Sequence, residues 1–537
     1  MEKFMQEDRS KLLTALLGVV IGVLLTIVVT NIAGRPGKKV RASYDNWNKL
    51  NVILREVEKN YVDTVDRASL TDAAVTAALA KLDPHSIYLP PVELESSETE
   101  LAGNFDGIGI QFNVPNDTAI VLEVIPGGPS EKVGLMKGDR IIKVDDKVIA
   151  GVKFPQDSMV RRMKGPAGTK VIITVKRDNS EIPFDITRGK IPVHCVDAAF
   201  MIDDTTGYIR LSKFTRATHD EVSSAADKLV DEGMRRLIFD LRDNTGGYFD
   251  QALLLSDMFL EKGDEIVYLQ GRSRKKESFK ADGKGKLKEI GLSVLINEST
   301  ASSSEIFSGA IQDNDRGVVV GRRSFGKGLV QEPIYFADGS GIRITVSRFY
   351  TPSGRCIQKP YSGEDYDYDI YRRWLGGEMF AKDSIKIDST DAYKTVGGRT
   401  VYGGGGIIPD IFVPVDTSRA SSFYFKCNKK ATPMRYASMV FDRYKKELGA
   451  IEDYAALDSF LEKIDIPSGF MAFAASKDGL RPAPGEWERT APYMLPQLRA
   501  LVARYSKLGD NAFYKLYLPV DDVVKVAIAS GSTVALQ

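Results

Sequence analysis

The stretch Ser293–Gln331, SVLINESTASSSEIFSGAIQDNDRGVVVGRRSFGKGLVQ, decides the fold at the centre of this chain. An apolar run at 294–296 is followed by small hydroxyl residues and then by apolar residues at helical spacing over 306–311. A second apolar run at 318–320 leads to Lys327, which lies between two glycines. This pattern predicts a strand, a tight turn, a helix, a second strand and a glycine loop, the alternation typical of an α/β domain.

The hydroxyl residues over 299–304 lie where the predicted turn enters the predicted helix. The helix dipole and the unpaired backbone N–H groups at such a position favour a nucleophile whose reaction develops an oxyanion. Hydroxyl residues are also common N-caps at helix starts. Taken alone, the local pattern favours capping over catalysis.

A catalytic serine needs a base, and this chain offers few. Its three histidines, His85, His194 and His219, lie in a predicted turn, a predicted strand and a predicted helix start, and none of these contexts is diagnostic of a Ser-His-Asp triad. A lysine can serve instead when the loss of surrounding water lowers its pKa toward neutrality. Lys327 is the candidate, because its glycine neighbours let backbone and substrate approach closely.

The same segment offers a rival interpretation as a phosphate-binding loop. Residues 321–327 match G-x-x-x-x-G-K after an apolar run. Such a loop continues with Ser or Thr, which holds magnesium, and with a helix whose N-terminus faces the phosphates. Here Gly328 follows, and the next residues predict a strand, so both requirements fail.

The central stretch resembles the carboxyl-terminal processing peptidases, also called tail-specific proteases. The resemblance is carried by T-A-S-S-S-E-I at 300–306, Q-D at 312–313, Arg316, Gly321 and F-G-K-G-L-V-Q at 325–331. It implies that Ser302 is the nucleophile, that Lys327, 25 residues later, is the general base, and that Gln331 orients the lysine. It implies no metal and no organic cofactor.

A second motif, D-L-R-D-N-T-G-G at 240–247, lies between a predicted buried strand and a predicted helix. Backbone N–H groups converge on anions at such turns, although glycines there also serve the shape of the turn alone. In the family this motif supplies one oxyanion donor. The resemblance therefore assigns that role to Gly246 or Gly247, with the backbone N–H of Ser303, where the family usually has alanine, as the second donor.

Residues 103–189 resemble a PDZ domain. The residues that carry this resemblance are F-D-G-I-G-I-Q-F at 105–112, P-G-G-P-S at 126–130, G-D-R-I at 138–141, a helical pattern at 154–163 and G-P-A-G-T at 165–169. A glycine loop can present N–H groups to a terminal carboxylate, and the strand after it can accept an extended peptide. We expect the tails of protein or peptide substrates to bind at Gly107, Ile108, Gly109 and Ile110.

The N-terminal region contains a candidate membrane anchor. Residues 12–34 carry no charge and are long enough to span a bilayer core of about 30 Å. A cleaved signal peptide is the alternative, but the apolar run is long for one and no A-x-A cleavage site is evident. We expect a single-pass anchor in the inner (cytoplasmic) membrane, and the resemblance implies that the catalytic part is exported to the periplasmic or extracellular side.

The composition bears on two other classes of protein, nucleic-acid-binding proteins and disulfide-rich proteins. The net charge of +1 over 537 residues gives no support to nucleic-acid binding. Three cysteines cannot all pair within one chain, which argues against a disulfide framework.

The sequence predicts an α/β (α+β) multidomain protein with a βαβ-type peptidase core. The expected parts are a cytoplasmic stub and transmembrane helix at 1–34, a helical region at 35–102, the PDZ domain at 103–189, the core at 190–416 and a mostly helical extension at 417–537. A Tyr- and Asp-rich insertion within about 357–402 is expected to be a surface elaboration near the cleft. Packing on the core, homo-oligomer formation and adaptor binding are all open roles for the C-terminal extension.

Together these features predict a membrane-anchored serine endopeptidase with a Ser–Lys dyad and PDZ recognition of substrate C-terminal tails. One alternative is a PDZ scaffold whose core has lost activity, which the presence of both Ser302 and Lys327 disfavours. Another is an acyl-CoA-handling fold, which shares the oxyanion turn but explains neither the PDZ segment nor the serine–lysine pair.

Overall fold

The computed structural model describes residues 48–101, 103–114, 117–361, 366, 368–417 and 421–531, which fall into two compact units, one up to Val75 and one from Thr76 onward. The first unit holds helix α2 (Asn48–Asn60) and the start of α3 (Arg67–Leu79). The predicted anchor at 12–34 lies outside the described residues. Within the described part of the chain, every helix is too short or too polar to traverse a lipid bilayer.

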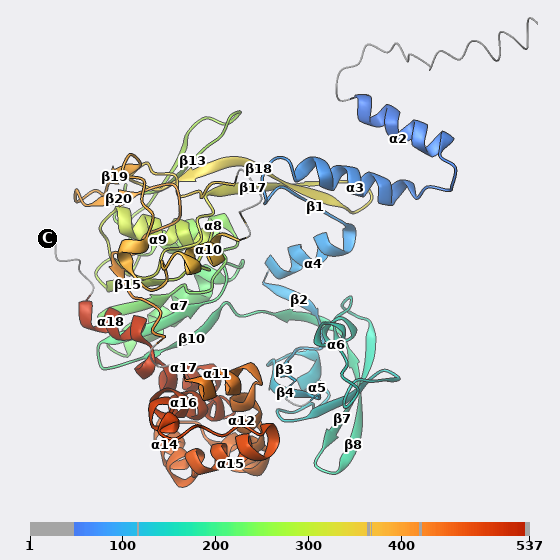
Figure 1. Cartoon of the computed structure of the whole chain (residues 1–537), viewed down its shortest axis with the longest axis vertical. Coiled ribbons are helices and arrows are strands. Elements are labelled where there is room, and N and C mark those ends of the chain that lie inside the picture. The colour runs from blue at the N-terminus through green and yellow to red at the C-terminus, as the bar shows by residue number, and fades with distance from the viewer. Residues whose placement is uncertain are drawn as a thin grey trace, which may run out of the picture. The chain divides into compact units, whose positions relative to one another are not determined.

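A six-stranded sheet forms the centre of the second unit (Figure 1). Its strands, in spatial order, are β10 (Val196–Met201), β11 (Thr206–Leu211), β12 (Arg236–Asp240), β15 (Gly291–Ile296), β16 (Val318–Gly321) and β21 (Ile411–Phe412). All neighbouring pairs are parallel except β10 with β11. Parallel strands are covered on both faces, so they appear in the sequence as continuous apolar runs, as at 294–296 and 318–320.

Helices cover both faces of this sheet. The bounds of these helices are α7 (Thr218–Asp231), α8 (Phe249–Asp257) and α9 (Ser303–Asp313) on one face, and α17 (Gly509–Tyr517), the short η2 (Leu518–Val520) and α18 (Asp522–Ser530) on the other. Successive residues of β12 alternate between the two cores: Leu237 and Phe239 pack with the first set, and Ile238 packs with the second. Packing on the core is therefore one role of the C-terminal extension.

A second, antiparallel sheet lies beside the central one and carries part of the cavity described below. It consists of β1 (Ile87–Leu89), β18 (Gly341–Tyr350), β13 (Glu265–Gln270) and β14 (Glu277–Lys280), with β17 (Leu329–Tyr335) also paired to β18. The loop that contains Lys327 thus continues into strand β17. The phosphate-loop hypothesis is wrong, because such a loop continues into a helix.

The segment predicted as a PDZ domain folds around a hydrophobic core of its own. Its elements are β3 (Ile110–Asn113), β4 (Ala119–Val124), α5 (Pro129–Lys132), β5 (Arg140–Val144), β6 (Lys147–Val148), α6 (Gln156–Met163), β7 (Lys170–Arg177) and β8 (Ser180–Thr187). The pair β2 (Asn104–Gly107) and β9 (Gly189–Pro192) joins it to the rest of the chain. Strand β3 ends the sheet order β3-β4-β5-β7-β8.

Most of the C-terminal extension is a helical bundle, as predicted, and it has a separate core. Its helices are α11 (Ser422–Lys429), α12 (Thr432–Arg443), α13 (Lys445–Ala450), α14 (Tyr454–Lys463), α15 (Ile466–Asp478) and α16 (Glu486–Ala503), drawn in orange and red in Figure 1. The insertion contains α10 (Asp369–Leu375), the short η1 (Lys382–Ser384) and the hairpin of β19 (Ala392–Lys394) and β20 (Thr400–Tyr402). Helix α4 (Pro91–Leu101) precedes the PDZ segment.

Candidate active site

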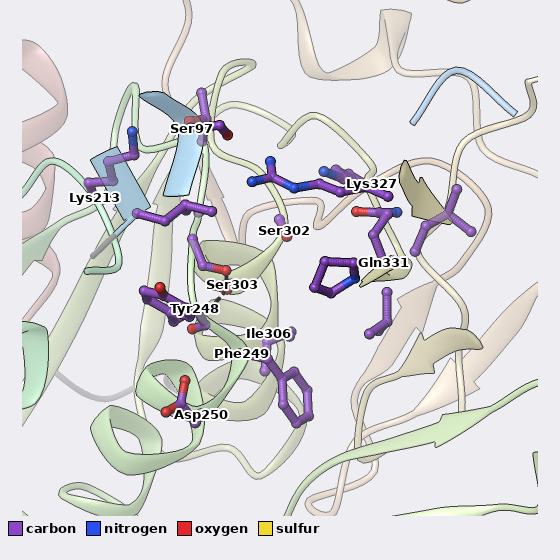
Figure 2. Close-up of a pocket in the computed structure, with 18 of the residues that line it drawn as sticks. Ser97, Lys213, Tyr248, Phe249, Asp250, Ser302, Ser303, Ile306, Lys327 and Gln331 are labelled. Carbon is purple, nitrogen blue, oxygen red and sulfur yellow. Dashed lines mark hydrogen bonds between the residues drawn. The ribbon is translucent and has the colours of Figure 1, made fainter. Parts of the chain in front are cut away.

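A cavity of about 720 Å³ lies where the turn after β12, the start of α9 and the loop before β17 meet (Figure 2). Its lining includes every core residue that the sequence singled out: Gly246, Gly247, Ser302, Ser303, Lys327 and Gln331. The predicted tail-binding loop at 107–110 does not line this cavity and belongs to the PDZ segment. The structure thus brings the core residues together from three separate parts of the sequence.

Ser302 immediately precedes α9 and has an unusual backbone conformation, with φ 57° and ψ −118°. Residues other than glycine seldom adopt positive φ, and strained backbone of this kind concentrates at functional sites. Gly246 lies directly against this turn, since a Cβ atom there would come 2.7 Å from the Cβ of Ser302 and 2.9 Å from the nitrogen of Ser303. The close approach requires glycine at position 246.

The other hydroxyls of the cluster have a structural role. The hydroxyls of Thr300, Ser303 and Ser304 each donate to a backbone carbonyl within 241–247, at 2.9 to 3.1 Å. Ser302 is the N-cap residue of α9 and forms a capping box with Glu305, whose carboxylate accepts from the N–H of Ser302 at 2.9 Å. Ser302 therefore caps the helix and also lines the cavity, so capping and a catalytic role are compatible at this position.

Glu305 connects the Ser302 turn to the Lys327 loop. Its buried carboxylate accepts four hydrogen bonds, from the N–H groups of Ser302 (2.9 Å), Gly326 (2.7 Å) and Lys327 (2.8 Å) and from the hydroxyl of Ser324 (2.5 Å). Burial raises the pKa of Glu305, and these donors act in the opposite direction. One side chain thus holds the backbone of both predicted catalytic residues.

Lys327 is half-buried and lines the cavity. Burial lowers the pKa of Lys327; the carboxylate of Glu305 opposes this effect, and the guanidinium of Arg343 adds to it. A lowered pKa increases the fraction of neutral amine at a given pH, and only the neutral amine can accept a proton.

Arg343, on β18, lines the same cavity and was not singled out from the sequence. Its Nη2 atom is buried without a hydrogen-bond partner in the described part of the chain. In the sequence Arg343 is one of two arginines in an alternating strand, so only the fold shows that its charge acts on Lys327.

Gln331 lies on β17, and its amide nitrogen donates to the hydroxyl of Thr345 on β18, at 3.3 Å. In the view of Figure 2, the amide oxygen of Gln331 is turned toward Ser302 and its nitrogen away from it. The hydrogen bond to Thr345 uses the amide nitrogen of Gln331 and leaves the amide oxygen on the side of Ser302.

The two glycines proposed as oxyanion donors are not equivalent. The N–H of Gly246 donates to Oδ1 of Asn244 at 2.9 Å, so it is already used inside the turn. No acceptor for the N–H groups of Gly247 and Ser303 is found among the residues that the structure describes. A Cβ atom at Gly247 would lie 2.0 Å from the carbonyl oxygen of Phe214, so this position requires glycine as well.

The insertion, expected as a surface elaboration near the cleft, contacts the loop before Lys327. Arg373 of α10 is 5% exposed and donates to the carbonyl oxygens of Arg323 (2.6 Å) and Ser324 (3.0 Å). This contact was not predictable from the sequence, because a lone arginine in an exposed-looking helix does not identify its acceptors.

None of the three histidines, all of which the structure describes, lines the cavity. His194 pairs with Glu221 and His219 with Asp220, both at 3.1 Å. Across the described ranges, no three His, Cys, Asp or Glu side chains lie together as the ligands of a metal ion would.

Comparisons with known proteins identify two domain families along the chain. The model of peptidase family S41 matches residues 205–370, and a PDZ domain model matches residues 107–187. The carboxy-terminal processing protease CtpA of Bacillus subtilis is 31% identical over 347 residues, which cover 64% of this chain and 74% of that protein. The carboxy-terminal-processing protease of Bartonella bacilliformis is 34% identical over 322 residues, 59% of this chain and 73% of that protein. Among solved structures, the photosystem II D1 C-terminal processing protease is 26% identical, covers 68% of this chain and 86% of that chain, and has a TM-score of 0.36.

Replacing the Glu305 carboxylate tests whether it holds the Ser302 turn and the Lys327 loop together. Glu305→Gln turns one acceptor oxygen into a donor that faces other donors, so at least one buried hydrogen bond is lost. We expect the free energy of unfolding, measured in urea, to fall by about 1–3 kcal/mol. Glu332→Gln makes the same chemical change at an exposed carboxylate paired with Arg274, and it should leave unfolding nearly unchanged. Equal stability of both variants would contradict the role given to Glu305.

Proposed function

The chain belongs to the carboxy-terminal processing proteases of peptidase family S41, and from this premise we propose that Ser302 and Lys327 form a Ser–Lys dyad that hydrolyses peptide bonds in protein substrates. The observation that carries the proposal is that both side chains line one cavity while Glu305 binds the backbone N–H groups of both residues. The strained backbone of Ser302 adds further support.

The proposed reaction is acyl transfer. Neutral Lys327 takes the proton from Oγ of Ser302 as that oxygen attacks the scissile carbonyl carbon, and the N–H groups of Gly247 and Ser303 hold the resulting oxyanion. The Lys327 ammonium returns the proton to the leaving amine, which departs and leaves an ester on Ser302. Water then attacks the ester carbonyl as Lys327 takes its proton, and the Lys327 ammonium returns that proton to Oγ of Ser302 as the ester bond breaks and the acid leaves. Gln331 orients Lys327 throughout. Each oxyanion donor is expected to contribute about 2.7–4 kcal/mol to transition-state stabilisation.

Tail recognition is assigned to the PDZ segment. In the described residues β4 is the only sheet neighbour of β3, so the other edge of β3 is open to an extended peptide. The loop at 107–110 leads directly into this strand, and Gly109 has φ +77°, a conformation that suits glycine. These features support binding of a substrate tail whose terminal carboxylate meets the loop.

The proposal also includes the location of the enzyme. The uncharged segment at 12–34 is long enough for a single-pass anchor in the cytoplasmic membrane, and the family resemblance favours a catalytic part on the exported side.

Cleavage of an unfolded model protein tests the dyad. Ser302→Ala removes the nucleophile and Lys327→Ala the base, so each should lower kcat/KM by about 10³-fold or more, because residues that act as a unit are needed together. Ser299→Ala, in the same hydroxyl cluster but outside the cavity lining, should cleave like wild type. Amidating the substrate's C-terminal carboxylate should raise KM if the PDZ loop binds it. Undiminished cleavage by Ser302→Ala would refute the dyad.

Arg343 should help to lower the pH at which the enzyme becomes active. Activity requires neutral Lys327, so kcat/KM should rise with pH as this lysine loses its proton. Arg343→Gln removes a positive neighbour that disfavours the protonated lysine, so the pKa of Lys327 should rise and the activity limb should move to higher pH. Arg343→Lys keeps the positive charge, so its kcat/KM should rise over nearly the same pH range as in the wild type. Arg274→Gln removes a positive charge at an exposed hairpin, and it should leave that pH range nearly unchanged as well. A rise of kcat/KM at lower pH in Arg343→Gln than in the wild type would contradict this electrostatic role.

A further inference from the structure

A chain of hydrogen bonds runs from the cavity into the structure behind it. Gln331 donates from Nε2 to Oγ1 of Thr345 at 3.3 Å, and Thr345 donates from Oγ1 to Oδ1 of Asp83 at 3.1 Å. Gln331 and Thr345 are direct partners in the register of β17 and β18. The register shifts between Val330 and Gln331, which is an irregularity of the kind that redirects side chains beside active sites.

Asp83 is fixed at the far end of this chain. It is 8% exposed, and its carboxylate also accepts hydrogen bonds from the N–H of His85 (2.9 Å), the N–H of Ser86 (2.9 Å) and the hydroxyl of Ser86 (2.6 Å). The turn that holds Asp83 leads into β1, which pairs with β18 on the side opposite β17. Asp83 and Gln331 therefore approach Thr345 from the two sides of one strand.

The chemistry of the three groups fixes the direction of the chain. Carboxylate oxygens only accept hydrogen bonds, and a threonine hydroxyl has a single proton to donate. Because that proton goes to Asp83, the hydroxyl of Thr345 can only accept from Gln331. The end of the Gln331 amide that faces Thr345 must then be its NH₂ group, which leaves the carbonyl oxygen on the opposite end.

The direction matters because the two ends of a glutamine amide have nearly the same shape, and only hydrogen-bond partners distinguish them. A carbonyl oxygen toward Lys327 accepts one of the amine protons and leaves the nitrogen lone pair for the hydroxyl of Ser302. An NH₂ group in the same place would compete for that lone pair.

We propose that Thr345 and Asp83 are positioning residues of the dyad: they hold the Gln331 amide with its oxygen toward Lys327, and so keep the lysine lone pair directed at Ser302. This inference rests on the proposed function and adds two residues that contact neither the substrate nor the reacting atoms. Asp83 lies 262 positions from Thr345 in sequence, so only the fold brings them together.

The simpler alternative is that these hydrogen bonds merely tie β18 to its neighbours. Thr345 offers a substitution that separates the two interpretations. Thr345→Val keeps the branched shape favoured in strands and the backbone N–H that donates to the hydroxyl of Ser86 at 3.1 Å, but it removes the hydroxyl. Thr345→Ser keeps the hydroxyl.

The test measures kcat and KM of the full-length protein on the unfolded model substrate, with urea unfolding as a check on folding. Wild type and Ser302→Ala are compared first, so a failure of the proposed function shows there and not in the Thr345 variants. Thr345→Val should lower kcat about tenfold or more with KM nearly unchanged, a loss common when an orienting partner of an active-site side chain is removed. Thr345→Ser should retain kcat within about threefold.

A double-mutant cycle with Gln331→Ala decides between positioning and general support of the strand. If Thr345 acts through Gln331, Thr345→Val should cause no further loss of kcat once the amide is absent. An equal loss in both backgrounds, failure of Thr345→Ser to restore kcat, or wild-type kcat in Thr345→Val would each overturn the proposal. If Thr345→Val does not fold, Thr345→Ala, which removes the hydroxyl and the methyl group but no charge, is used in the same cycle.

Discussion

The architecture of the site depends on one buried carboxylate. Ser302 begins a helix and Lys327 lies in a loop after a different strand, and the Glu305 side chain accepts hydrogen bonds from the backbone of both. Burying a carboxylate costs free energy unless hydrogen bonds replace its water, and four donors do so here. The same contacts restrain the strained backbone of Ser302, whose conformation would otherwise relax.

Further contacts hold the two halves of the site in place around this carboxylate. Hydroxyls of the helix turn bind carbonyls of the 241–247 loop, which brings Gly247 beside Ser303. Arg373 holds the loop before Lys327 through the carbonyls of Arg323 and Ser324. Such support matters for catalysis, because a misplacement of about 1 Å can cost about 10²-fold in rate. The insertion and the central sheet thus contribute to the same geometry.

Much of this site was predictable from sequence, because its motifs are local. The strand, turn, helix and strand of 293–331 are present as β15, α9 and β16, and the serine, lysine and glutamine of the motif line one cavity. The PDZ segment and the helical character of the extension were also predicted, and the structure has both.

The features of the site that were not predicted from the sequence are of two kinds. Some depend on contacts between distant segments, and others depend on which N–H groups of a turn are hydrogen-bonded within the turn itself. The Asn244 side chain accepts from Gly246, and a motif of residue types cannot show this. Asp83 and Arg343 carry charge next to Lys327 only because β1, β17 and β18 are neighbours. The mostly helical character predicted for the extension did not identify the sheet face that α18 covers.

The central claim is that Ser302 carries the acyl group during the reaction. The most direct measurement stops the reaction of the full-length protein in acid within the first turnovers and locates any attached peptide by fragment mass spectrometry. The account predicts an ester of the N-terminal part of the substrate on Ser302 in the wild type, and none in Ser302→Ala or Lys327→Ala. An acyl group on a different side chain would contradict it.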